Sequence, residues 1–123
     1  MIMYYFDTKE ELIAAALLHL ARQMAESLES VLPARRASAS QIVNTLVGAG
    51  SLKEIQPTLR LWFEIVGLAM RGAGPYQTTA QLILSGWEDW IAEKLGPDRA
   101  HLAPELLARI EGELMVSLIR GDD

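Results

Sequence analysis

The chain has 123 residues, and 50% of them are hydrophobic, which is enough for one globular domain with a sizeable core. It contains no cysteine, which excludes disulfides, zinc–cysteine sites and thiol catalysis. The formal net charge is −5, so this chain alone is expected to bind DNA poorly, because affinity for DNA draws mainly on Lys and Arg. No basic segment followed by an apolar stretch opens the chain, and no apolar run approaches the roughly 20 residues that cross a bilayer, which predicts a soluble cytoplasmic protein without membrane contact.

The first predicted element is a long helix over residues 8–32. Apolar residues recur here every three or four positions, as they do along the rest of the chain, whereas two-residue alternation is almost absent. Thr8 and Glu11 have the spacing of a capping box, which marks a helix start. Pro33 disfavours a helical conformation of the residue before it, so we expect the helix to end at Leu32, after about six to seven turns.

The second predicted helix is weaker and lies in the middle of the first half of the chain. It is expected to follow Ser38 or Ser40, both of which are good N-cap residues. Gly48 and Gly50 are expected to stop it. Residues 51–56 are ambiguous between a loop and a short helix of one or two turns.

A stronger third helix is expected to begin at Pro57, which is acceptable in a first helical turn, and to run to Met70 or Arg71. The helix has almost no polar face except at Arg60, Glu64 and Gly67. A helix that is apolar on almost every face belongs inside a domain, so we expect this one to be buried.

Two further helices are predicted in the second half. Glycines and a proline at residues 72–75 predict a break, after which a helix is expected from Tyr76 or Thr78 to Leu95. A final helix is expected from about Pro104. The sequence therefore predicts an all-α, single-domain bundle of five helices, or six if residues 51–56 are helical.

Motifs for catalysis, metal binding and cofactor binding are not evident. His19 has no His or acid at the four-residue spacing of a helical metal pair, and His101 lies after a turn, near the start of the last element; both are interpreted as ordinary surface or satisfied histidines. The serines are not in a nucleophile elbow, and no glycine-rich loop has the pattern of a phosphate site. We therefore predict no enzyme activity, no metal and no cofactor. An active site assembled across helices, for example from His19 with Glu64 or Arg60, stays open as an alternative.

The apolar interior is rich in Trp and Met, which permits two interpretations. The first is a packed core, and the second is a ligand cavity, because aromatic and flexible apolar side chains typically line pockets. Polar groups that could orient a ligand in such a cavity are Arg60, Glu64, Gln81 and Ser85. The residues predicted to line it are Leu20, Met24, Trp62, Val66 and Met70.

The N-terminal segment carries a resemblance to a known family. It reads Met3-Tyr4-Tyr5-Phe6-Asp7-Thr8-Lys9-Glu10-Glu11-Leu12. This segment resembles the point in TetR-type transcriptional regulators where the DNA-recognition helix ends, with a Tyr-x-His-Phe-like signature followed by x-Ser/Thr-Lys-Glu/Asp-x-Leu. Phe6, Thr8, Lys9 and Leu12 match that pattern, whereas Met3 replaces its first Tyr and Tyr5 stands where His is usual.

The resemblance implies a domain organisation. Residues 1–7 would be the remnant of the recognition helix, residues 8–123 the effector-binding and dimerisation domain, and residues 8–32 the helix that links the two. Most of the helix-turn-helix would then be missing, so DNA binding is expected only in a full-length form. In that form Tyr5 and Lys9 are expected to contact DNA phosphates.

The resemblance also implies a function. The chain is expected to be the regulatory domain of a repressor that binds a small apolar effector and forms a homodimer through its last two helices. On the last helix we expect Ile110, Met115 and Ile119 to face outward and Leu107, Leu114 and Leu118 to face inward. The alternatives are a stand-alone helical dimerisation or interaction protein without a ligand, and a monomer with all its apolar residues internal. The residues assigned to the dimer interface are Trp87, Ile91, Ile110, Leu114, Met115 and Leu118.

Overall fold

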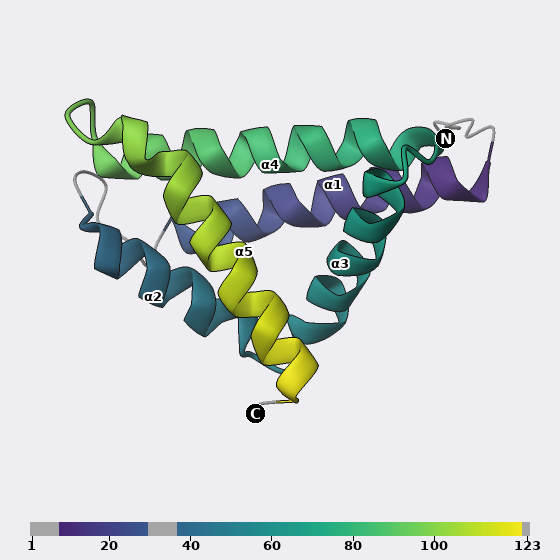
Figure 1. The fold of residues 1–123 in the computed structure, drawn as a ribbon, viewed down its shortest axis with the longest axis horizontal. Helices are drawn as coiled ribbons and strands as arrows, with labels where there is room; N and C mark the ends of the chain where they lie inside the picture. Colours follow the sequence, from purple (N-terminus) through teal and green to yellow (C-terminus); the bar gives the residue numbers. More distant parts are fainter. Residues whose placement is uncertain (1–7, 30–36, 122–123) are drawn as a thin grey trace.

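The computed structural model describes residues 8–29 and 37–121. Within these ranges the chain forms five α-helices, one short 3-10 helix and no strand, which confirms the all-α prediction. The helices α1 and α4 lie side by side along the longest dimension of the molecule, and α3 and α5 extend away from them and converge near the C-terminus (Figure 1). The elements are α1 (Lys9–Leu28), α2 (Ala39–Gly50), α3 (Gln56–Met70), α4 (Gly74–Leu95), the 3-10 helix Ala100–Leu102 and α5 (Ala103–Arg120).

The start of α1 follows the predicted cap, but its end does not follow the prediction. The Thr8 side chain accepts a hydrogen bond of 3.1 Å from the backbone N–H of Glu11. The helix ends at Leu28, about one turn before the expected end at Leu32, and Glu29 is its C-cap. The predicted breaker, Pro33, lies outside the described residues.

The start of α2 is set by a complete capping box. The Ser38 side chain accepts a hydrogen bond of 3.1 Å from the Gln41 N–H, and the Gln41 side chain accepts one of 2.8 Å from the Ser38 N–H. Of the two predicted starts, the one after Ser38 is therefore confirmed. Gly48 does not stop the helix, which continues to Gly50. Residues 51–55 form turns rather than a separate helix.

The prediction that α3 lies inside the domain is wrong. Only one face of α3 is buried, through Leu59, Trp62 and Ile65, and Met70 at its end is 78% exposed. The helix packs against α1 and α4 and forms an edge of the molecule (Figure 1). Its neighbours cover one side only, so much of its apolar sequence remains partly exposed.

Prolines in the first turn set the starts of the last two long helices. The break predicted at residues 72–75 is shorter than expected, because α4 begins at Gly74 and includes Pro75 in its first turn. Gly96, with a φ of +88°, ends α4. Pro104 lies in the first turn of α5.

A single hydrophobic core joins all five α-helices. Its members include Ala14 of α1, Ile42 of α2, Ile65 of α3, Ile91 of α4 and Ile110 of α5, each at most 3% exposed. No helix in the described part of the chain is long and apolar enough to span a membrane.

Candidate ligand pocket

A pocket opens where the five α-helices converge. Each of them contributes to its lining, and so does Ile55 in the turn before α3. Its volume is about 80 Å³ and it is partly open to solvent, whereas a single water molecule needs roughly 10–15 Å³ on a comparable measure. The walls are mainly apolar. The helix α1 contributes Leu17, Ala21, Met24 and Leu28 to them.

Two of the five predicted ligand-binding residues line this pocket, and three do not. Met24 and Trp62 are lining residues. Leu20 is 36% exposed on the flank of α1, and Met70 is 78% exposed at the end of α3. Val66 is partly buried against the core but is not part of the lining.

The polar groups proposed from the sequence do not reach the pocket. Exposed positions outside the lining are occupied by Arg60, Glu64, Gln81 and Ser85. The lining residues with polar side-chain atoms are instead Thr58, Trp62, Trp87 and Glu111.

The main polar contact of the pocket joins α3 to α5. The Trp62 indole Nε1–H donates a hydrogen bond of 2.8 Å to Glu111 Oε2. Burial raises the pKa of the Glu111 carboxyl above its ordinary value, and the hydrogen bond from Trp62 opposes this effect in part. The sequence contained a signal for this position. Glu111 lies four residues after Leu107 and three before Leu114, both of them buried, so all three share one helical face.

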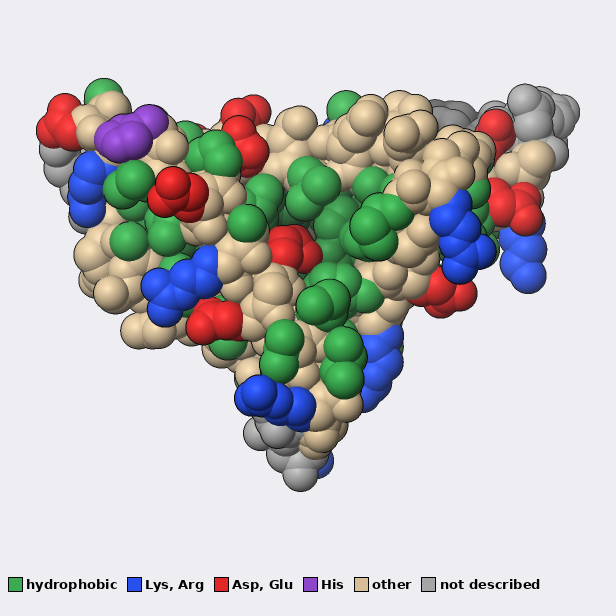
Figure 2. Space-filling model, viewed as in Figure 1, with side chains coloured by type: hydrophobic (Ala, Val, Ile, Leu, Met, Phe, Trp, Pro, Cys, Tyr) green, Lys and Arg blue, Asp and Glu red, His purple; other side chains and the backbone are tan. Residues whose placement is uncertain are grey.

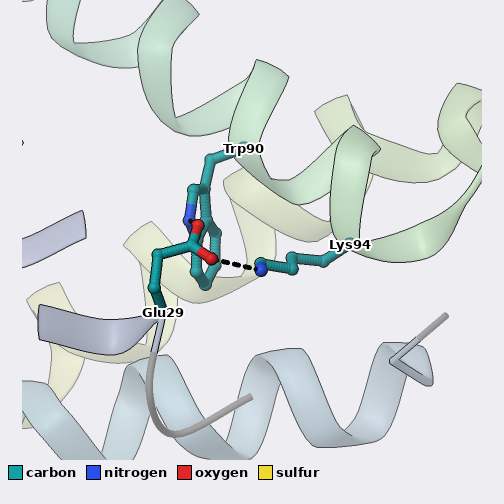
Figure 3. A network of polar contacts seen from close by, with 3 residues as sticks. All are labelled: Glu29, Trp90 and Lys94. Carbon is teal, nitrogen blue, oxygen red and sulfur yellow. Dashed lines mark hydrogen bonds and ion pairs between the residues drawn. The ribbon is translucent and has the colours of Figure 1, made fainter. Parts of the chain in front are cut away.

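A second acidic group, Glu29, fixes the end of α1 to α4 (Figure 3). Lys94, only 2% exposed, contacts Glu29 Oε2 at 2.6 Å, and the Trp90 Nε1–H donates a hydrogen bond of 2.7 Å to Glu29 Oε1. The ammonium group also lies 5.5 Å from the centre of the Trp90 ring. The pKa of the Glu29 carboxyl is lowered, mainly by the hydrogen bond from Lys94 and to a smaller extent by the one from Trp90. Both carboxylate oxygens are engaged within the protein, so this network is structural rather than a ligand site.

The histidines are exposed, as expected of surface residues. His19 lies on α1 and His101 in the 3-10 helix, and neither lines the pocket. Arg60 and Glu64, suggested as partners of His19 in an assembled active site, are exposed residues of α3. In the described ranges, no three His, Cys, Asp or Glu side chains come together as possible metal ligands.

Three of the residues assigned to a dimer interface belong to the core of this chain. Ile91 is 0%, Ile110 3% and Leu114 9% exposed. The expectation that Ile110 faces outward is therefore wrong, and it lines the pocket together with Leu114. Trp87 is also a lining residue, with its ring 5.6 Å from that of Trp90 in an edge-to-face arrangement.

The outward face of α5 nevertheless carries an apolar stripe. It consists of Ala108, Gly112, Met115, Val116 and Ile119, at the spacing of one helical face. Met115 is 43%, Val116 38% and Ile119 77% exposed, which confirms the outward direction predicted for Met115 and Ile119. Figure 2 shows hydrophobic side chains gathered over α5 and between α3, α4 and α5.

The residues predicted to contact DNA lie at the start of the chain. Tyr5 is outside the described residues, whereas Lys9 is the exposed first residue of α1. Comparison with protein-family models, with curated proteins and with solved structures found no match to this chain. The fold and the site define an all-helical protein with an apolar, partly open pocket.

Proposed function

We propose that this chain is the ligand-binding and dimerisation domain of a TetR-type transcriptional regulator, and that its pocket binds a small, largely apolar ligand. The observation that carries the proposal is the pocket into which all five α-helices converge. Pockets of this kind, with apolar walls and a few polar groups, are the usual form of small-molecule sites. The Trp62–Glu111 pair provides the polar groups that would orient the ligand.

The position of α1 supports a regulatory role for ligand binding. Four lining residues come from this helix, so a ligand that changes the shape of the pocket would act on α1 directly. The same helix begins directly after the segment that resembles the end of a DNA-recognition helix. Its other end is fixed to α4 by Glu29. Three of the four lining residues of α1 lie in its C-terminal half, so a ligand that tilts the helix about its fixed end at Glu29 would move the N-terminal end furthest, and in a full-length protein this would change the placement of the DNA-binding domains.

The ligand proposal is tested with N-phenyl-1-naphthylamine, a neutral apolar dye whose fluorescence rises in apolar surroundings. We expect saturable binding to the wild-type chain. Ala21→Leu places a larger side chain in the pocket wall and should weaken binding about tenfold or more. Ala16→Leu is the matched control, because Ala16 is exposed on the same helix and does not line the pocket. Absence of saturable binding to the wild type, or equal weakening by both variants, would contradict the proposal.

The apolar stripe on α5 supports the second part of the proposal, a homodimer. Three of its side chains are exposed by 38% or more, and such a contiguous patch typically marks an interface. At Gly112 an added Cβ would meet no heavy atom within 4 Å, so a second copy could approach the helix closely. We assign this face to a second copy of the chain, packed across a two-fold axis.

The dimer proposal is tested by analytical ultracentrifugation. We expect the wild-type chain to sediment as a dimer and Ile119→Glu as a monomer, because the variant places unpaired charges in an apolar contact. Leu52→Glu is the control, since Leu52 is 49% exposed in the turn before α3. A dimer that survives Ile119→Glu would place the interface elsewhere. The alternative function, an interaction module without a ligand, predicts a dimer that does not bind the dye.

A further inference from the structure

The described lining of the pocket has an acidic group but no basic group. Among the described residues, Glu111 is the only ionisable side chain in the lining, to which no Lys, Arg or His contributes. The indole of Trp62 is hydrogen-bonded to it, and the indole of Trp87 lines the same pocket. The pocket thus combines apolar walls, two aromatic rings and one acidic group.

The contacts of Glu111 leave one carboxylate oxygen available. Oε2 accepts the hydrogen bond from Trp62, whereas no described residue donates a hydrogen bond to Oε1. A neutral glutamine could accept the same indole N–H without the free-energy cost of burying a charge. The contact with Trp62 alone therefore does not account for a carboxylate at this position.

The burial of Glu111 indicates which charge on a ligand would be favoured in the pocket. Its pKa is raised, which means that the protein around it disfavours the ionised form. A cation placed beside Oε1 would stabilise that form. An anionic group would be disfavoured beside Glu111, because the described lining has no basic group to bind it.

We propose that the pocket selects apolar ligands that carry a single positively charged amine, with the ammonium group paired to Glu111 Oε1. This inference rests on the proposed ligand-binding function and adds the chemical class of the ligand. A charge-assisted hydrogen bond contributes more than one between neutral groups, and the difference corresponds to roughly tenfold in affinity.

The test compares three ligands that share an eight-carbon chain and differ in their head group: n-octylamine, n-octanol and octanoate. Their dissociation constants are measured at pH 7 by isothermal titration calorimetry, with tryptophan fluorescence as a second signal. We expect octylamine to bind about tenfold tighter than octanol, and octanoate to bind most weakly. In Glu111→Gln the ratio of octylamine to octanol affinity should fall to within about twofold of one.

Glu113→Gln is the matched control. Glu113 lies on the same helix, is exposed and does not line the pocket; its Oε1 is 3.9 Å from Arg109 Nε. This variant should therefore keep the wild-type ratio of octylamine to octanol affinity. Equal affinities of octylamine and octanol for the wild type, tightest binding by octanoate, or an amine preference that survives Glu111→Gln would overturn the inference while leaving ligand binding intact. If none of the three ligands binds, the proposed function itself fails.

Discussion

The helices α2 and α5 approach each other closely at Gly50. There an added Cβ would collide with Leu114 Cδ2 and lie 3.4 Å from Leu59 Cδ2. At Gly48, two residues earlier on α2, the same Cβ would meet no heavy atom within 4 Å. Gly50→Ala and Gly48→Ala therefore make the same chemical change on the same helix in two different surroundings.

The expected magnitudes follow from two opposing effects. Replacing Gly by Ala within a helix stabilises it by up to about 1 kcal/mol. Overpacking a core position costs about 1–3 kcal/mol. Gly48→Ala should therefore be neutral or stabilising, and Gly50→Ala should be less stable than Gly48→Ala by about 1–3 kcal/mol. For a chain of this size that difference corresponds to roughly 3–5 °C in Tm for each kcal/mol.

The assay is thermal and urea unfolding followed by circular dichroism, together with titration of N-phenyl-1-naphthylamine. Leu114 and Leu59 both line the pocket, so the movement that accommodates the extra methyl group of the Gly50→Ala variant should also weaken dye binding. Gly48→Ala should leave binding unchanged. Equal stability and equal dye affinity in the two variants would refute the close packing of α2 on α5.

Three further predictions concern the tryptophans and their acidic partners. Because the pKa of Glu111 is raised, its ionisation destabilises the folded chain as pH rises above 4.5. The Glu111→Gln variant should therefore have a higher Tm than the wild-type chain at pH 7, and this difference in Tm should vanish below pH 4.5. The pKa of Glu29 is lowered, so the ionised carboxylate contributes to folded-state stability above pH 4.5, and this contribution is lost as pH falls through the lowered pKa. The Glu29→Gln variant should therefore have a lower Tm than the wild-type chain at pH 7, and the difference in Tm should shrink in acid. A Tm series over pH for each variant checks both signs. Trp62→Ala should cost about 3–5 kcal/mol in urea unfolding and weaken dye binding while the dimer persists; an unchanged dye affinity would argue for a packed core.

The helix starts were predictable because they depend on neighbours in sequence. Ser38 and Gln41 satisfy each other's backbone groups within one turn, and the pattern of such a pair is visible without a structure. The end of α1 and the exposure of α3 were not predictable in this way. They depend on which helices pack against each face, and Met70 reads as a core residue until its neighbours are known.

The pocket was predictable as a possibility but not residue by residue. Leu17, Ala21, Met24 and Leu28 follow one another at intervals of four, three and four, so they share one face of α1. Leu20 is 36% exposed and lies on the flank of that face. A general apolar stripe includes all five residues, and only the positions of the other helices separate the lining from the flank.

In the described part of the chain a carboxylate lies beside an indole N–H twice, and the two cases differ in the burial of the carboxylate and in the presence of a cation. At Glu29 the indole of Trp90 is joined by the buried ammonium group of Lys94, and the pKa of the carboxyl is lowered. At Glu111 the indole of Trp62 is present, the described lining supplies no cation, and burial raises the pKa of the carboxyl. The first case shows how this fold stabilises an ionised carboxylate in contact with tryptophan. A ligand amine at Glu111 Oε1 would supply the group that Lys94 supplies at Glu29, which is why a charged amine, rather than a neutral apolar ligand, best completes the pocket.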